Sequence, residues 1–363
     1  MIPLLLLLGC GGNGNEPEPI PGNVSISVSP ETLQISASSG TENLKVSASN
    51  EWGISSNQGW CKVTPSGGVA GNTVVKVSVD GNPSDKTRTA TITFTAGTFS
   101  QHYTVTQKGQ IPSGDIPTPS GYTLVWQEEF NAPRQSDGKA VLPDKSRWYY
   151  EVAEPGWVNN EKQKYVEGVF QGDTVTSIYD GTLKIVARKK GDVVISGRIN
   201  TTESWTYGYF EARLKVPGGK GTWPAFWMMP KNFSNWPDDG EIDIMEYVGY
   251  NPNVVHSSIH CKAYYHSIGT QKTASRNIAD AETQFHVYAV EWTPDHIKGF
   301  VDGTNYFTFL NDKKGDKNTW PFHTPFLLKL NLAWGGDWGG AEGIDESKLP
   351  AVYEIDYVRV FQR

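Results

Sequence analysis

The sequence predicts an all-β protein with two sandwich domains, and three observations support this prediction. Short runs of alternating polar and apolar residues, rich in Val, Thr and Ser, fill residues 24–108. Longer strand-like segments rich in Trp, Tyr and Phe fill residues 120–363. Few segments repeat apolar residues at the three- and four-residue spacing of a helix. We therefore expect a small Ig-like β-sandwich followed by a large jelly-roll sandwich with a curved sheet.

A short apolar run from Ile2 to Leu8 comes before both domains and ends at Gly9-Cys10. The run is too short to cross a bilayer. The order Leu7-Leu8-Gly9-Cys10 resembles a bacterial lipobox, so we expect lipidation of Cys10, with residues 1–23 as signal and tether. An ordinary signal peptide with a chance cysteine is the alternative. This predicts an exported bacterial lipoprotein, held to a membrane at the cell surface (outer membrane) or in the periplasm.

The first predicted sandwich, residues 24–108, consists of short strands bounded by Gly, Pro, Asn or Asp. Glu51-Trp52, Gly59-Trp60-Cys61 and the closing TVTQKG resemble the BACON domain of bacterial secreted carbohydrate-active proteins. Trp52 and Trp60 are interpreted as core or spacer residues, with a glycan platform as the alternative. The segment QIPSGDIPTPS, residues 109–119, is predicted to be a linker.

Composition narrows the classes of partner. The net charge is -7 and no basic cluster is visible, which disfavours a nucleic-acid or polyanionic partner. The 13 Trp residues suit either a large β core or a cleft in which rings stack on sugars. Apart from Cys10 the cysteines are Cys61 and Cys261, which fall in different predicted domains. We expect these two to be unpaired and buried, and the protein to be a monomer.

Three carboxylates fall within the segment EIDIMEY, at Glu241, Asp243 and Glu246. In a regular strand alternate side chains point to opposite faces, so Glu246 would point into the core, away from Glu241 and Asp243. An unpaired carboxylate buried there would be costly. A single-residue β-bulge near Ile244-Met245 returns Glu246 to the face of Glu241, and such bulges are common beside active sites. We therefore predict a bulge in this strand.

With that bulge the two glutamates lie about four residue steps apart, roughly 13 Å between α-carbons. On a curved sheet their carboxyl groups can approach about 5 Å, as in retaining glycosidases, whereas inverting enzymes need about 6.5–9.5 Å. Neighbouring negative charges also hold at least one proton above its normal pKa, which suits a general acid. For an isolated pattern of this kind, an acidic strand edge or a calcium site is the alternative.

The surrounding run WPAFWMMPKNFSNWPDDGEIDIMEYVG resembles glycoside hydrolase family 16, in the bulged form found in laminarinases and related endo-β-1,3-glucanases. Matching segments continue in order through residues 120–363, among them WVNNEKQKY, SGRINTTESWTYGYFEARLKVP and LKLNLAWGGDWGG. The resemblance implies that Glu241 is the nucleophile, Glu246 the acid/base and Asp243 an assisting carboxylate. It also implies that catalysis needs no cofactor.

The resemblance further implies a set of substrate-binding residues. Trp223 and Trp227 match donor-side tryptophans of the cleft, and they share strand parity. For each candidate a structural role is the alternative: core packing for the tryptophans, strand-end hydrogen bonds for the polar residues, and a satisfied histidine. The remaining candidates are Arg198, Asn160, Asn331, His256, His260 and Trp338.

A structural calcium far from the cleft is a further implication of the resemblance. Glu129, the Gly181 carbonyl and Asp356 occupy the matching positions. Hard oxygen ligands of this kind suit calcium, and a solvated pair of carboxylates is the alternative.

The sequence therefore predicts an endo-acting retaining β-glucanase that hydrolyses β-1,3-glucan, mixed-linkage β-1,3/1,4-glucan, or both. A related hydrolase of agarose, porphyran or carrageenan is one alternative. A non-catalytic glycan-binding surface lipoprotein is the other, although a lectin has no need of three intact carboxylates.

Overall fold

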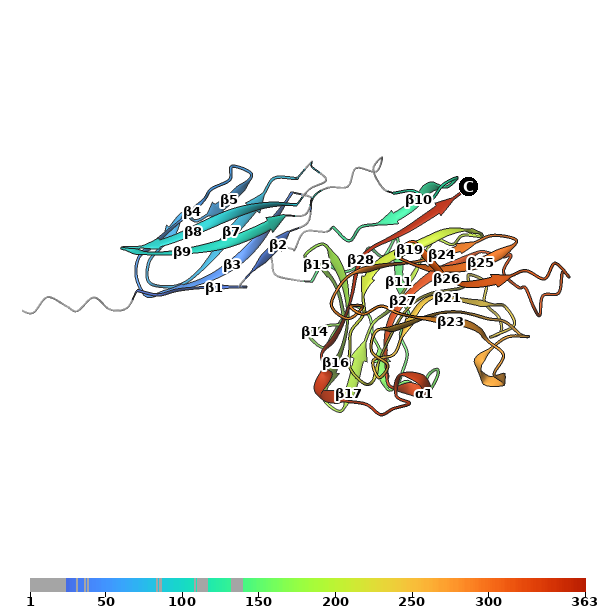
Figure 1. Cartoon of the computed structure of the whole chain (residues 1–363). Coiled ribbons are helices and arrows are strands. Elements are labelled where there is room, and N and C mark those ends of the chain that lie inside the picture. The colour runs from blue at the N-terminus through green and yellow to red at the C-terminus, as the bar shows by residue number, and fades with distance from the viewer. Residues whose placement is uncertain are drawn as a thin grey trace, which may run out of the picture.

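The computed structural model describes residues 24–30, 32–35, 37, 39–82, 84, 87–107, 109, 117–131 and 140–363. Cys10 and the whole predicted signal and tether lie outside these residues, as does most of the predicted linker. Two all-β units are present, coloured blue to cyan and green to red in Figure 1, as the sequence predicted.

The first unit is a sandwich of a four-stranded and a five-stranded sheet. Alternation of buried and exposed residues along its strands places one face of each sheet in a common core. One sheet contains β1 (Ile26–Ser29), β3 (Gly40–Ala48), β7 (Gly71–Val79) and β5 (Cys61–Thr64). The other contains β2 (Leu33–Ile35), β9 (Phe99–Gln107), β8 (Arg88–Ala96), β4 (Trp52–Ser56) and β6 (Gly67–Gly68).

The two tryptophans of this unit are in structural positions. Trp52 is buried and packs against Phe94, with ring centroids 5.9 Å apart. Trp60 is half-buried, and the guanidinium of Arg88 lies 4.1 Å from its ring centroid. The core and spacer interpretation therefore fits both residues better than a glycan platform.

The second unit is a jelly-roll sandwich of a ten-stranded and a seven-stranded sheet (Figure 1). The ten-stranded sheet contains β12 (Gln163–Tyr165), β17 (Val193–Ser196), β16 (Thr182–Lys190), β28 (Ala351–Gln362), β19 (Gly208–Lys215), β24 (His286–Trp292), β25 (His296–Val301), β26 (Thr304–Leu310), β10 (Thr123–Glu128) and β15 (Thr176–Tyr179). The seven-stranded sheet runs in the order β11 (Trp148–Tyr150), β18 (Arg198–Thr201), β27 (Phe326–Trp334), β20 (Thr222–Pro230), β21 (Glu241–Tyr247), β22 (Val254–His260), β23 (Lys272–Asn277).

The remaining elements are short. They are the hairpin of β13 (Val169–Phe170) and β14 (Asp173–Thr174), the helix α1 (Gly336–Gly339), and the 3₁₀ turns η1 (His266–Ile268) and η2 (Glu346–Lys348). Among the residues described, no helix has the length and apolar character needed to cross a membrane.

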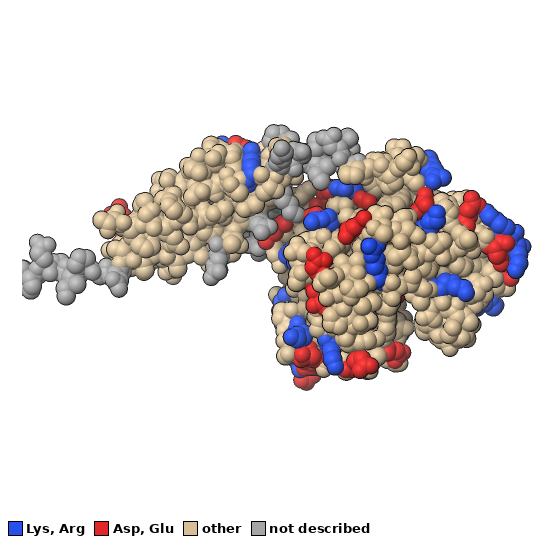
Figure 2. Space-filling model, in the orientation of Figure 1, with Lys and Arg blue, Asp and Glu red and all other residues tan. Residues whose placement is uncertain are grey.

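The two sheets of the jelly roll enclose one apolar core that includes Trp148, Trp292 and Phe226. Cys61 and Cys261 are both buried and unpaired, which confirms the prediction for them. On the face in Figure 2, Lys and Arg alternate with Asp and Glu over the second unit, so charge of one sign does not gather there. One face of the seven-stranded sheet packs into the apolar core. Its opposite face carries the candidate active-site residues described next.

Candidate active site

Strand β21 contains the predicted bulge. Asp243 pairs with Ser258 of β22, and the next register pair is Glu246 with His256. Three residue steps on β21 therefore match two on β22, which leaves one extra residue on β21. Ile244 and Met245, although adjacent, are both fully buried in the apolar core. The bulge thus returns Glu246 to the polar face of the sheet, as predicted.

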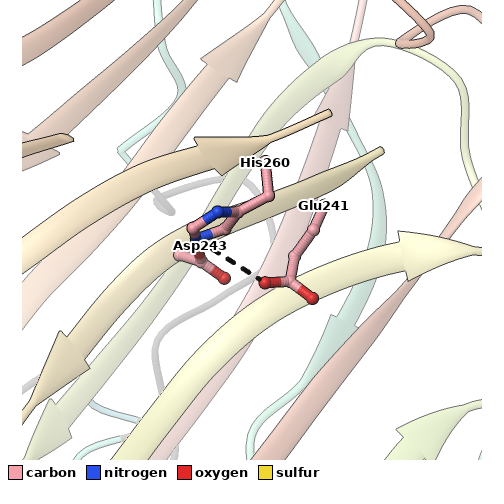
Figure 3. A group of neighbouring side chains, drawn as sticks. All are labelled: Glu241, Asp243 and His260. Carbon is pink, nitrogen blue, oxygen red and sulfur yellow. Dashed lines mark ion pairs between the residues drawn. The ribbon is translucent and has the colours of Figure 1, made fainter. Parts of the chain in front are cut away.

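The carboxylates are held by neighbouring aromatic and imidazole groups. His260 Nε2 lies 3.3 Å from Asp243 Oδ2 and 3.9 Å from Glu241 Oε1, and Figure 3 shows the three side chains pointing toward one another. The Trp223 indole N–H donates to Glu246 Oε1 over 3.0 Å. The Trp236 indole N–H donates to Glu241 Oε2 over 3.2 Å. Each glutamate is therefore oriented by one indole.

Burial raises the pKa of Glu241, Asp243 and Glu246 to about 8 each. The negative charge of Asp243 adds to this rise at both glutamates. His260 opposes the rise at both glutamates, and Arg198 opposes it at Glu241. A carboxyl with a raised pKa retains its proton at neutral pH, which a general acid requires.

The raised pKa values predict that the stability of the folded state decreases as pH rises. Between the ordinary carboxyl pKa of about 4 and the folded value of about 8, the folded state binds more protons than the unfolded state, so stability decreases as pH rises. Asp243→Asn removes one such group. We expect its Tm to exceed that of the wild type at pH 8 by at least about 2–4 °C, the shift for about 1 kcal/mol in a domain of this size.

Thermal unfolding of wild type and Asp243→Asn from pH 4 to pH 8 measures this effect. Asp238→Asn is the matched control, because Asp238 lies in the adjoining loop and pairs with Lys262 at 3.1 Å. A gain in Tm that stayed constant from pH 4 to pH 8 would contradict the electrostatic explanation.

The predicted donor-side residues lie on the same face, on β20, β27 and β18. Trp227 pairs in register with Asp243, and Arg198 pairs with Asn331. The Trp227 indole N–H donates to Asn331 Oδ1 over 2.7 Å, and Asn331 Nδ2 donates to the Tyr165 hydroxyl over 3.1 Å. The side-chain oxygen and nitrogen of Asn331 are therefore both hydrogen-bonded within the protein, and the bond through its oxygen orients Trp227.

The glycine-rich loop that contains α1 forms another border of the site. Trp338 packs edge-on against Trp223 and His256, with centroids 5.5 and 5.1 Å away. Asn160 Nδ2 donates to Asp337 Oδ1 over 2.8 Å and so ties the loop to residues 157–161. Burial lowers the pKa of His256, which favours its neutral form. Trp338 thus packs against the indole that donates to Glu246 and against the register partner of Glu246.

One group of three side chains in the described part of the chain could hold a metal ion, and it consists of Glu241, Asp243 and His260. Their ligand atoms lie within 4.8 Å of one another. The predicted calcium ligands lie elsewhere. There, Glu129 binds Arg359 through both carboxylate oxygens, at 2.8 and 3.1 Å, and Asp356 pairs with Arg213 at 2.6 Å. Both carboxylates thus have a cationic partner in this structure.

Three residues of the site were not singled out from the sequence. Trp236 holds Glu241, and Glu151 bridges Arg198 and Lys329. Lys329 had a signal in the sequence, because it is a lone charge in the apolar strand LLKLNLAW at the same parity as Asn331. No sequence pattern indicated a role for Glu151, since its partners are distant in sequence.

Two partly buried glutamates and a buried aspartate on one bulged strand, lined by tryptophans in a jelly roll, define a glycoside hydrolase. The chain belongs to the glycosyl hydrolases family 16, whose profile matches residues 162–359. The profile of the viral BACON domain matches residues 25–110.

Relatives agree with this assignment. The chain is 44% identical to a beta-glucanase of Rhodothermus marinus over 254 residues, which cover 66% of this chain and 85% of that protein. It is 34% identical to a glucan endo-1,3-beta-glucosidase of Cryptopygus antarcticus over 258 residues, 66% of this chain and 91% of that protein. The crystal structure of the laminarinase from Rhodothermus marinus superposes with a TM-score of 0.61 at 43% identity, covering 66% of this chain and 97% of that one.

Proposed function

We propose that the protein is an endo-acting retaining β-glucanase for β-1,3-glucan, mixed-linkage β-1,3/1,4-glucan, or both. The observation that carries the proposal is the bulge in β21, which brings Glu246 onto the face of Glu241 and Asp243. Similarity to glucanases over the whole catalytic unit supports the choice of polymer.

In the proposed mechanism Glu246 donates its proton to the leaving glycosidic oxygen while Glu241 attacks the anomeric carbon. Glu241 is suited to be the ionised partner, because Arg198 opposes the rise of its pKa. The negative charge of Asp243 raises the pKa of both glutamates, and at Glu246 this favours the protonated acid. Water activated by the deprotonated Glu246 then hydrolyses the glycosyl-enzyme.

The acidic residues next to the catalytic strand do not by themselves indicate which polysaccharide is the substrate. Asp238 and Asp239, which precede the catalytic strand, pair with Lys262 and Lys317 at 3.1 and 2.9 Å. Trp338 and Trp223 provide aromatic rings of the kind that stack on the apolar face of a pyranose. A neutral β-glucan is therefore the proposed substrate, and agarose, porphyran and carrageenan serve as comparison polymers.

Product analysis on laminarin and barley glucan tests the proposed function. We expect a falling average chain length with soluble oligosaccharides early in the reaction, as an endo enzyme produces, and initial products in the β-anomeric form by NMR. Release of α-anomers first would contradict the retaining mechanism. Activity confined to agarose, porphyran or carrageenan would contradict the polymer, and binding without any product would favour a lectin.

Three other expectations stay predictions. Lipidation of Cys10, with export to the cell surface or periplasm, concerns residues outside the described part of the chain. A monomeric state and a calcium ion at Glu129, Gly181 and Asp356 are likewise untested. Thermal unfolding with added calcium against EDTA would test the ion directly, because a ligand that binds only the folded state raises Tm.

A further inference from the structure

A cluster of two buried cations and one partly buried carboxylate underlies the donor side of the site. The Glu151 carboxylate accepts a hydrogen bond from Arg198 Nε through Oε2 and from Lys329 Nζ through Oε1, the latter over 3.0 Å. Arg198 is 6% exposed and Lys329 is 3% exposed. We call these residues the Glu151 cluster. One carboxylate therefore holds two cations that are removed from water.

Both cations of the Glu151 cluster contact the candidate sugar platform. The guanidinium of Arg198 lies 4.9 Å from the ring centroid of Trp227 and 4.9 Å from that of Trp157. The ammonium of Lys329 lies 5.2 Å from the Trp227 centroid. Cations at these distances are attracted to the ring, so they restrain its plane. Asn331 restrains the same ring at its indole nitrogen.

The strand order places the Glu151 cluster beside the reacting centre. Asp243 of β21 pairs with Trp227 of β20, which pairs with Lys329 of β27 and then Asn200 of β18. Neighbouring strands lie about 4.8 Å apart, so β27 is roughly 10 Å from the catalytic strand. A glycan that crosses these strands from the catalytic carboxylates would therefore pass over β27.

Stability alone does not account for the Glu151 cluster. A buried ion pair gains little over apolar residues of similar volume, because removing charges from water offsets their attraction. Burial, reinforced by Arg198, lowers the pKa of Lys329 to about 8, and Glu151 opposes that fall. The Arg198 and Lys329 charges in turn hold the pKa of Glu151 below its usual value against the effect of burial. Each cation therefore depends on the shared carboxylate.

We propose that Glu151 and Lys329 are positioning residues for the donor half of the cleft, fixing the plane of Trp227 on which the sugar stacks. The proposal rests on the proposed function and adds a determinant of substrate affinity to it. Neither residue touches the reacting atoms. Their effect reaches the substrate through Arg198 and Trp227.

The kinetic test compares Glu151→Gln and Lys329→Met in the full chain with Glu154→Gln. Glu154 is the matched control, because it is a carboxylate on the same segment that pairs with a lysine at 2.6 Å but is 73% exposed. We expect each cluster variant to raise KM for long β-1,3-glucan oligosaccharides about tenfold with kcat within about twofold, as lost uniform binding predicts. The rise should vanish for the shortest fragments, which do not reach β27.

A second measurement does not require turnover. In protein labelled with 5-fluorotryptophan, the ¹⁹F signal of Trp227 is assigned by its loss in Trp227→Phe. We expect this signal to shift or broaden in both cluster variants and to stay unchanged in Glu154→Gln. Lys329→Met keeps the length and apolar stem of the side chain, so it carries both tests if Glu151→Gln does not fold.

The outcomes separate the two proposals. Wild-type protein without activity on any β-glucan overturns the proposed function, and the ¹⁹F spectra then still decide whether the Glu151 cluster holds Trp227. Active wild type with unchanged KM in both cluster variants overturns the positioning role. A loss of kcat at constant KM overturns it as well, since it would place these residues in the chemical step.

Discussion

Replacement of Glu241 by glutamine is expected to lower kcat on β-glucan by at least about 10⁴-fold, on the scale seen when a covalent nucleophile is removed. The amide keeps the size and the hydrogen bond from the Trp236 indole, which donates to Oε2 over 3.2 Å in the wild type. It cannot form the glycosyl-enzyme. The fold should survive, because burial disfavours the charged carboxylate in the first place.

The measurement is the initial rate of reducing-end release, with circular dichroism to confirm the fold and Asp238→Asn as the control. Chemical rescue adds a sharper criterion. In Glu241→Gly, azide can enter the vacated space and attack the anomeric carbon, so we expect an α-glycosyl azide. A β-glycosyl azide in this variant would show that Glu241 is not the nucleophile.

Glu246→Gln is expected to lower kcat on β-glucan by about 10²–10⁴-fold, the usual contribution of a general acid–base group. The glycosidic oxygen of a polymer leaves poorly without a proton. An activated aryl β-glycoside has a leaving group that needs no proton. The rate at which this substrate forms the glycosyl-enzyme should therefore fall far less in Glu246→Gln. The Trp223 indole N–H that donates to Glu246 should keep the amide in place.

The pH profile provides the second readout for Glu246. In the wild type, activity should fall as pH rises through about 8, because the acid then loses its proton. This alkaline limb should be absent when Glu246→Gln acts on the activated substrate. If kcat fell equally on the polymer and on the aryl glycoside, and activity still decreased at alkaline pH, Glu246 would not be the general acid.

The strand content and the bulge were predictable because both follow from local pattern. Alternation of polar and apolar residues determines which face of a strand is buried. In EIDIMEY that alternation conflicts with a buried carboxylate at Glu246, and inserting one residue resolves the conflict at a lower cost than burial without a partner. The structure confirms this, since Ile244 and Met245 both enter the core.

The polar contacts around the site were less predictable, because they join residues that are far apart in the chain. Glu151 meets Lys329 across 178 positions, and no local pattern encodes such a pair. The contacts of Asn331 within the protein were not predictable for the same reason, since its partners Trp227 and Tyr165 lie on other segments. A lone cation in an apolar strand was the one usable signal for Lys329.

The extra residue in β21 also bears on how such a site could be gained or lost in evolution. Deletion of one codon at Met245 would leave every carboxylate in the gene, yet it would restore a regular register of β21 against β22. The side chains beyond the deletion would keep their faces, because the acid would then stand four regular residue steps from Glu241, on the same face. Loss of the extra residue together with the bulge is therefore a change that leaves all three carboxylates on one face of the sheet.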